Sequence, residues 1–458
     1  MDRIPTGTQT GRSFDSLLEG RRVGGLQVMV IIVSALVSMV DGFDTQSIAF
    51  AAPSIAKAFE TPAAGFGPVF GIGLLGGLIG AIISGMIGDR CGRKPILLIS
   101  LGIIAVASIL TVFIGSIAAL SVARLITGLG LGGALPSVIA LTSEYAPVRR
   151  RAAIVALMFC GFPLGAVVGG LASSALIPKF GWSSVFLAGG IAAAAILVVT
   201  ALAVPESVRF LAARSDKKPL SAVLTKLKLD TADAALIVPA PAETRAPLPS
   251  LFTNGRAIGT IMLWIILLLS LLMTYFLTNW IPIIANQKGL DARTGILGAV
   301  MLNLGSIIGS LVLGRFVRAR PAATIAVGYV AGAIAIVGIG QLGHTVPGLL
   351  ITCFLAGLFG IGAQLCTIGV CATFYGDALR ATGVGAAVGV ARLGAIAGPV
   401  LGGILIAAGV TTPVIFVVIG LVSFAAAIAM VVMGLTVLRG THGGDIIDSP
   451  DVSAVVEV

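Results

Sequence analysis

Long apolar segments alternate with short polar segments along the whole chain. Each apolar segment reaches the length of about 18 residues or more that predicts a transmembrane helix. Twelve of them are found, at 24–52, 64–88, 95–115, 117–143, 152–176 and 182–204, and then at 257–284, 293–315, 321–342, 346–374, 382–408 and 411–437. This pattern predicts an all-α membrane protein with twelve transmembrane helices.

The twelve segments fall into two groups of six. The polar segment between the groups contains Lys217, Lys218, Lys226 and Lys228, followed by the Pro- and Ala-rich stretch Val238–Pro249. We therefore expect an N-terminal six-helix bundle over 1–204, a cytoplasmic linker over 205–255, and a C-terminal bundle with a cytoplasmic tail over 256–458. Within the linker, Pro219–Asp230 fits either a short amphipathic helix on the membrane surface or a solvated loop.

The basic residues predict the orientation of the helices. With the N-terminus inside, 23 of the 29 Lys and Arg residues fall in cytoplasmic segments and four fall on the opposite side. Cytoplasmic loops carry such an excess of Lys and Arg, so both termini are expected in the cytoplasm. The first apolar segment is too long for a cleavable signal, and the chain is expected to be a multi-pass protein of the inner (cytoplasmic) membrane.

The two groups of helices resemble each other at a nearly constant shift along the sequence. Gly76, Gly80 and Gly85 align with Gly305, Gly309 and Gly314, and Gly165, Gly169 and Gly170 align with Gly398, Gly402 and Gly403. The repeat predicts two pseudo-symmetric six-helix bundles. Transporters built in this way bind their substrate between the halves and rock one half against the other.

Composition excludes several other classes of protein. Charged residues make up 10% of the chain and hydrophobic residues 57%, which is too few charges to cover a soluble surface. The net charge of +10 does not indicate nucleic-acid binding, because the basic residues lie between apolar segments. The five cysteines and two histidines fit no metal site, and no cofactor is expected. An enzyme would need a nucleophile and base within the spans, and a sensor would need a sizeable soluble domain. The sequence shows neither pattern, so both classes are disfavoured.

Four charged residues stand deep within the predicted spans: Asp41, Asp44, Arg124 and Arg392. A charge in the bilayer is costly, so such residues are candidates for function. Asp41 and Asp44 are three residues apart, on one face of a helix, at a depth where either can pair with Arg124. Two carboxylates so close together favour retention of a proton by one of them. The alternative is a purely structural ion pair between the first and fourth helices.

Arg392 has no obvious acidic partner in the C-terminal group of helices. The planar fork of a guanidinium suits a carboxylate, so Arg392 is a candidate anchor for an anionic substrate. The alternatives are a guanidinium that binds backbone carbonyls or one that extends to the inner face.

The loop between the second and third spans carries a specific motif. Residues Gly85–Pro95 match G-x-x-x-D-R-x-G-R-K/R, which resembles the loop signature of the major facilitator superfamily. The resemblance implies that Asp89 and Arg90 latch the two halves in the outward-open state; an anchor of charge at the inner face is the alternative. The predicted gating residues are Gly85, Asp89, Arg90, Arg93, Glu144 and Arg380. Glu144 is expected to pair with Arg149–Arg151 or with Arg90.

The first span carries a second motif, D-G-x-D-x-x-x-x-x-F-x-x-P, over Asp41–Pro53. It resembles the signature of the aromatic acid:proton symporters within the same superfamily. This resemblance implies uptake of a small aromatic acid anion with protons, in which Asp41, Asp44 and Arg124 serve proton coupling and Arg124 and Arg392 bind substrate. Further contacts to the substrate are expected from Phe43, Phe162, Tyr275, Trp280, Phe359, Asn279, Asn303 and Gln364.

Other transporters of the superfamily remain as alternatives. A sugar-type facilitator shares the Pro205–Arg209 pattern but lacks the expected P-E-T-K-G sequence after the last span, where Leu438–Thr441 stands instead. An exporter of drug-like compounds, or a facilitator of another small organic acid, is also compatible with the spans. The partners expected are the acid, protons and the lipid bilayer, with no nucleic acid, and the protein is expected to be a monomer.

Overall fold

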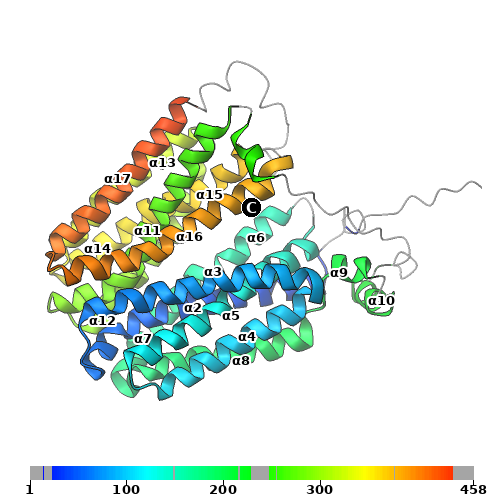
Figure 1. Cartoon of the computed structure of the whole chain (residues 1–458), viewed down its shortest axis with the longest axis horizontal. Helices are drawn as coiled ribbons and strands as arrows, with labels where there is room; N and C mark the ends of the chain where they lie inside the picture. The colour runs from blue at the N-terminus through cyan, green and yellow to red at the C-terminus, as the bar shows by residue number, and fades with distance from the viewer. Residues whose placement is uncertain are drawn as a thin grey trace, which may run out of the picture.

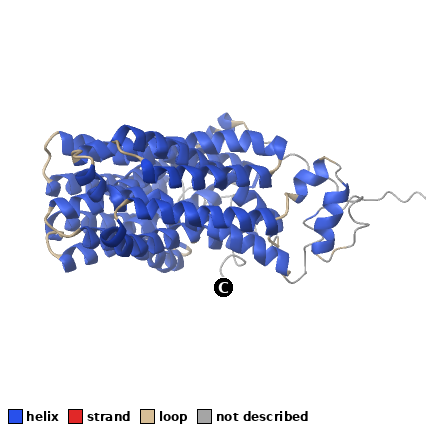
Figure 2. Ribbon diagram, turned by 90° about the horizontal axis from the view of Figure 1, so that it is seen from below, coloured by secondary structure: helices blue, strands red, loops and turns tan. Residues whose placement is uncertain are grey.

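The computed structural model describes Phe14 and residues 23–147, 150–214, 217–227, 229, 247–253, 255–375 and 377–436. Regular secondary structure within these ranges is helical throughout (Figures 1 and 2). Twelve helical segments are long and apolar enough to cross a membrane, so the predicted twelve-helix class is confirmed.

The six N-terminal spans follow the predicted order. They are α2 (Gly25–Ala58), α3 (Phe66–Cys91) preceded by η1 (Ala63–Gly65), α4 (Arg93–Leu110) continued by η2 (Thr111–Phe113), α5 (Ile117–Tyr145), α6 (Arg151–Phe159) with α7 (Gly161–Phe180), and α8 (Ser183–Ala203). The first helix continues through Pro53, beyond its predicted end at residue 52. Proline is tolerated inside transmembrane helices because neighbouring groups satisfy the backbone that it leaves unpaired.

The six C-terminal spans repeat this order. They are α11 (Ala257–Gln287), α12 (Ala292–Val317), α13 (Pro321–Leu342), α14 (Val346–Ala356) with the π-helical turn η6 (Gly357–Ile361) and α15 (Gly362–Phe374), α16 (Asp377–Ala407), and α17 (Thr412–Thr436). Each predicted span therefore corresponds to one helix or to one nearly continuous series of helices.

The segment between the two bundles contains short helices: α9 (Val208–Ala213), α10 (Lys217–Lys226) and η5 (Leu248–Phe252). Leu220, Val223 and Leu224 of α10 are buried against the N-terminal bundle. Of the two interpretations of Pro219–Asp230, a helix or a loop, the structure has a helix that ends at Lys226. Lys228, Asp230 and most of Val238–Pro249 lie outside the described residues. The predicted domain boundaries stay a prediction.

Backbone contacts at glycines hold equivalent helices together in the two halves. A Cβ atom at Gly76, Gly80, Gly161 or Gly165 would overlap a backbone carbonyl oxygen of the neighbouring helix, and so would a Cβ at Gly305, Gly309, Gly394 or Gly398. The carbonyls belong in turn to Leu125, Leu129, Ala35 and Met39, and to Phe354, Leu358, Leu268 and Leu272. Between the two halves, each glycine and the residue whose carbonyl it meets are shifted by the same number of positions in the sequence. The same helix crossings therefore recur in both halves.

The two bundles approach each other most closely at the end remote from α9 and α10. There, α3 packs on α16, α7 on α12 and α2 on α11, and the rings of Phe70 and Trp280 lie 5.7 Å apart. A Cβ atom at Gly67 would lie 3.0 Å from the Cα atom of Gly403. Figure 1 shows the bundles separating toward the end that carries α9 and α10, which we call the linker end.

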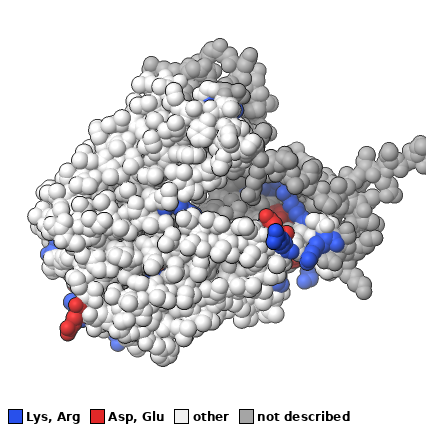
Figure 3. Space-filling view, viewed as in Figure 1, with Lys and Arg blue, Asp and Glu red and all other residues white. Residues whose placement is uncertain are grey.

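On the face shown in Figure 3, charged residues gather at the linker end, with a smaller group at the opposite end, and the surface between them is largely uncharged. Because the number of spans is even, the helix starting at Gly25 and the helix ending at Thr436 have these termini at the same end of the bundle. That this end faces the cytoplasm stays a prediction.

Candidate functional site: a charged cavity between the two bundles

A cavity of about 290 Å³ lies between the two bundles. Its walls come from α2, α3, α5, α6 and α7 of the N-terminal half and from α11, α15 and α16 of the C-terminal half. Eight residues predicted from the sequence line it: Asp41, Asp44, Phe162, Arg124, Tyr275, Asn279, Gln364 and Arg392. The fold thus brings the four deep charges together in one space.

Glycines on α3 and α5 leave room for this cavity. Gly73, Gly77, Gly128 and Gly132 all line it. A methyl group at Gly77 would lie 4.0 Å from the Arg392 guanidinium, so larger side chains there would crowd the arginine.

The glycine between the two acidic residues of the first-span motif has its own structural role. A Cβ atom at Gly42 would overlap the backbone carbonyl of Phe162 on α7. Glycine at this position therefore allows α7 to approach α2, which places Phe162 at the cavity beside Asp41.

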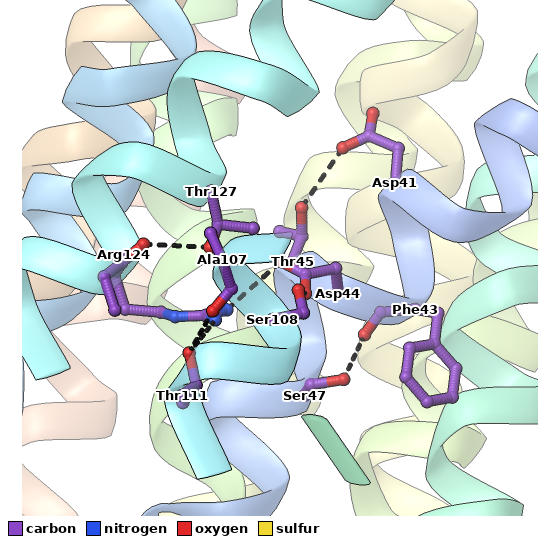
Figure 4. A network of polar contacts seen from close by, with 11 residues as sticks. Asp41, Phe43, Asp44, Thr45, Ser47, Ala107, Ser108, Thr111, Arg124 and Thr127 are labelled. Carbon is purple, nitrogen blue, oxygen red and sulfur yellow. Dashed lines mark hydrogen bonds and ion pairs between the residues drawn. The ribbon is translucent and has the colours of Figure 1, made fainter. Parts of the chain in front are cut away.

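Asp44 and Arg124 form a buried ion pair (Figure 4). One Asp44 carboxylate oxygen lies 3.1 Å from a guanidinium nitrogen of Arg124, and the other accepts a hydrogen bond from Ser108 at 3.0 Å. Arg124 also donates to the Thr111 hydroxyl at 3.3 Å and lies 4.8 Å from the centre of the Phe186 ring. The structure thus selects Asp44 rather than Asp41 as the partner of Arg124.

Asp41 lies outside this network, as Figure 4 shows. Its carboxylate accepts a hydrogen bond of 3.3 Å from Thr45, one turn along the same helix. Arg392 lines the same cavity from α16 of the other half. Among the described residues, neither Asp41 nor Arg392 forms a direct ion pair. An acidic and a basic side chain therefore face one cavity from opposite halves without a direct ion pair between them.

Four predicted contacts to the substrate lie outside the cavity lining. The ring of Phe43 packs inside the N-terminal bundle, 2.9 Å from the Cβ positions of Gly169 and Gly189. Phe359 lies in the π-helical turn η6, where its backbone packs against α13. A role in binding stays a prediction for both.

The other two, Trp280 and Asn303, lie at the closed end of the cavity. The Trp280 side chain is fully buried, and its ring nitrogen donates to the carbonyl oxygen of Pro399 at 3.0 Å. Asn303 on α12 is hydrogen-bonded to Gln46 on α2. In this conformation both side chains join helices to one another, and their contact with substrate is untested.

Polar residues of the site that were not predicted from the sequence are Ser38, Thr45, Gln46, Ser108 and Thr111. Ser108 and Thr111 are three apart near the end of the third span, a spacing that places both hydroxyls on one helical face. That spacing was the available signal, because two hydroxyls on one face of an apolar helix point to a buried polar partner.

A sequence profile described as the Major Facilitator Superfamily matches residues 34–392. The chain belongs to the major facilitator superfamily. The family predicted from the Gly85–Pro95 loop is thereby confirmed.

Named relatives within the superfamily are carriers of aromatic acids. A gallate transporter of Pseudomonas putida is 34% identical over 428 residues, which cover 93% of this chain and 95% of the relative. A 4-hydroxybenzoate transporter, PcaK, of Acinetobacter baylyi is 33% identical over 431 residues, covering 92% of this chain and 94% of the relative. The resemblance found in the first span is confirmed, and this member of the superfamily is a transporter rather than an enzyme.

The fold is shared with solved structures of the superfamily. The proton:xylose symporter XylE bound to 6-bromo-6-deoxy-D-glucose matches with a TM-score of 0.63 at 18% identity, covering 89% of this chain and 96% of that one. At this identity the similarity concerns the fold alone.

The superfamily loop signature forms a tight turn between α3 and α4. Gly92 has a φ of +98°, a conformation that glycine adopts at no steric cost. Asp89 pairs with Arg93 of the same loop, both being partly exposed to solvent. Arg90 is exposed, and a Cβ atom at Gly85 would meet only open space. The predicted latch between Asp89, Arg90 and the other half therefore stays a prediction.

Glutamates at the linker end fix this turn to the rest of the N-terminal bundle. The Glu206 carboxylate accepts hydrogen bonds from the backbone N–H groups of Arg93 and Lys94, at 2.8 and 3.1 Å, and so caps α4. Glu144 accepts from the Ser207 hydroxyl at 2.7 Å and from the Arg209 backbone N–H at 3.4 Å. These two hydrogen bonds join Glu144 to the start of α9. The ion pairs expected for Glu144 with Arg149–Arg151 or Arg90 stay a prediction, and Arg149 lies outside the described residues.

The remaining predicted gating residue, Arg380, is exposed near the start of α16. Its Nε donates to the carbonyl oxygen of Ala372 at 3.0 Å. This bond connects the linker-side ends of α15 and α16, and a gating role for Arg380 stays a prediction.

Proposed function

We propose that this carrier imports a small aromatic carboxylate together with protons by alternating access across the inner membrane. The observation that carries the proposal is the unequal pairing of the two cavity arginines. Arg124 is paired with Asp44 at 3.1 Å, whereas Arg392 has no direct ion pair among the described residues. A guanidinium without a direct ion pair in a largely enclosed cavity is a site for a carboxylate.

The apolar walls and the names of the relatives support an aromatic ring on that carboxylate. Gallate and 4-hydroxybenzoate, which those names specify, are both hydroxylated benzoates. Phe162, Ile48 and Val69 supply apolar surface in the cavity. The ring lies against these side chains while its carboxylate binds Arg392.

Unpaired polar side chains of the cavity support recognition of ring hydroxyl groups. Gln364 is 4% exposed, and its amide makes no hydrogen bond with another described residue. The buried Ser38 hydroxyl, on the opposite half, also lacks a partner among them. A site with buried polar groups discriminates strongly against a substrate that leaves them unpaired. We therefore include Gln364 and Ser38 as contacts to hydroxyl groups of the substrate.

Asp41 is the proton carrier in this proposal. Protonation of Asp44 would break its ion pair with Arg124, whereas protonation of Asp41 breaks no ion pair and removes only the negative charge that faces Arg392. Asp44 instead holds Arg124 in place. We therefore assign the coupling proton to Asp41 rather than to Asp44 in this proposal.

Charge neutrality then couples the proton to the acid. With Asp41 ionised and no substrate bound, the four charges of the cavity sum to zero. With Asp41 protonated and one carboxylate on Arg392, they sum to zero again. A proton alone or an acid alone leaves one net charge, which is costly to move across the bilayer. Only the empty and the fully loaded carrier change conformation readily.

Transport in proteoliposomes tests this mechanism. An inward proton gradient is expected to drive accumulation of labelled 4-hydroxybenzoate by the wild type. Asp41→Asn is expected to abolish that accumulation but to retain exchange of labelled for unlabelled acid at equal pH, because Arg392 is intact. The matched control is Asp291→Asn, which removes a carboxylate outside the spans and retains both activities.

Two results would contradict the proposal. Gradient-driven accumulation by Asp41→Asn at the wild-type level would show that Asp41 is not the coupling group. Wild-type protein that only equilibrates the acid, without accumulating it in response to the proton gradient, would be a facilitator rather than a proton-coupled importer.

A further inference from the structure

Two buried amide side chains join the halves beyond the cavity, toward its closed end. The Nε2 atom of Gln46 donates to Oδ1 of Asn303 at 3.1 Å, and Nδ2 of Asn303 donates to Oε1 of Gln46 at 3.1 Å. Gln46 belongs to α2 and Asn303 to α12, so the pair crosses from one bundle to the other. Their exposed fractions are 1% and 6%, so water competes little for either amide.

The asparagine is held in position by its own helix. Its Nδ2 atom also donates to the carbonyl oxygen of Ala299 at 2.8 Å, one turn back on α12. Phe50, Ile296 and Ala299 belong to the apolar cluster that surrounds this part of the interface. In such surroundings an amide that loses its partner is left unsatisfied, which makes separation of the two amides unfavourable.

The other contacts that close this end are of a different kind. Phe70 packs on Trp280, Gly67 lies against Gly403, and the Cβ position of Gly170 lies against Val300. These contacts are apolar or involve only backbone. At this end of the bundle, where every connecting loop is described, the amide pair supplies the side-chain hydrogen bonds that cross between the halves.

We propose that Gln46 and Asn303 form an uncharged latch that holds the carrier closed at the end remote from the linker and opens each time the carrier exposes its cavity there. Alternating access requires α2 and α12 to separate at this end, and that movement breaks both hydrogen bonds. The latch carries no charge, so its strength does not follow the proton state of Asp41. The proposal of a latch rests on the alternating access in the proposed function, but not on which acid the carrier transports.

Side-chain length provides a specific test. A glutamine and an asparagine together bring three methylene groups to the pair. Gln46→Asn leaves two and Asn303→Gln leaves four, so either single variant mismatches the pair. The double variant Q46N/N303Q restores three methylene groups with the amides exchanged. A role in bonding predicts that the double variant recovers what each single variant loses.

The conformation is read directly from distances between spin labels. Lys57 and Ala408 are exposed at the closed end on opposite halves, and cysteines there carry the labels. The exposed native residues Cys91 and Cys160 are replaced by serine in the full-length protein. Pulsed dipolar spectroscopy in lipid nanodiscs, without substrate or proton gradient, then gives the ratio of open to closed populations at this end.

Loss of two neutral hydrogen bonds is expected to raise the ratio of open to closed populations by roughly 10- to 100-fold. Each single variant should show this rise, and Q46N/N303Q should return to within a few-fold of the wild type. Equal distance distributions in the wild type and both single variants would overturn the proposal, and so would a double variant no closer to the wild type than the singles.

A second variant covers the case in which a length change prevents folding. Gln46→Met keeps an unbranched side chain of similar length and removes the hydrogen bonds, so it should show the same rise. A well-folded methionine variant with the wild-type ratio would overturn the latch. Since no substrate enters the measurement, failure of aromatic acid transport would leave this result unchanged.

Discussion

Replacing Asp44 by asparagine should destabilise the protein far more than the same replacement at Asp41. The Asp44 side chain is 3% exposed and that of its partner Arg124 is 4% exposed, so solvent screens their interaction little. Asp44→Asn keeps an oxygen for the Ser108 hydroxyl but leaves the guanidinium without its counter-charge. Breaking one side of a buried ion pair costs about 3–5 kcal/mol of the free energy of unfolding.

The control lies on the same helix. Asp41 has one hydrogen bond of 3.3 Å and no ion pair among the described residues, so Asp41→Asn should cost about 1 kcal/mol or less. The double variant Asp44→Asn/Arg124→Gln replaces the ion pair by neutral amides. It should be less destabilised than the sum of its single variants, with a coupling energy of about 2 kcal/mol.

Unfolding in mixed micelles by a denaturing detergent measures these free energies, with tryptophan fluorescence as the signal. Equal losses for the two aspartate variants would refute the reasoning, because of the two carboxylates only Asp44 forms an ion pair among the described residues. Strict additivity in the double-mutant cycle would refute it as well, since it would mean that Asp44 and Arg124 stabilise the fold independently.

Three further predictions concern the packing of α5 and the N-terminal caps of α4 and α12. Gly132→Ala should reduce the yield of monodisperse protein sharply in size-exclusion chromatography, because its Cβ would overlap a backbone carbonyl of α3, whereas Gly369→Ala, which meets open space, should behave as the wild type. Glu206→Ala removes the cap of α4 and should cost about 1–2 kcal/mol in the micelle unfolding assay. Hydrogen bonds from Thr294, first from its hydroxyl and then from its backbone N–H, lower the pKa of the Asp291 carboxyl. The contribution of Asp291 to stability is therefore present above the ordinary pKa of 3.8 and lost as pH falls through the lower folded value. Asp291→Asn should remove that part of the acid dependence of the thermal unfolding midpoint, and an unchanged profile would contradict it.

The helices were predictable because membrane spans depend on length and apolar content alone. The spans predicted at 321–342 and 346–374 coincide with helical segments of the structure, and the others differ by a few residues at their ends. Helix α2 continues through Pro53 because packing within the bundle holds it, which local sequence does not reveal. The depth of a charge was also predictable, since each residue adds a fixed rise to a helix.

The direction in which each side chain points was harder to predict than its depth in the membrane. Asp41 and Asp44 lie at nearly the same height, and only the positions of Ser108 and Arg124 determine which of them is paired. Trp280 and Asn303 lie at plausible depths for contact with substrate, but their helices turn them toward neighbouring helices at the closed end. Such orientations depend on the packing of helices distant in sequence, which hydrophobic pattern does not encode.

The glycine contacts that recur in the two halves have a consequence for motion. Where backbone touches backbone, the separation of two helices is set by covalent geometry, and no rotamer change can widen it. The pairs α3 with α5, α2 with α7, and α11 with α16 are of this kind. Each half therefore behaves as a stiff body with few internal ways to absorb strain. In the proposed mechanism, a binding event in the cavity would therefore rotate one half against the other rather than deform either half, and a small change of charge would act across the thickness of the membrane.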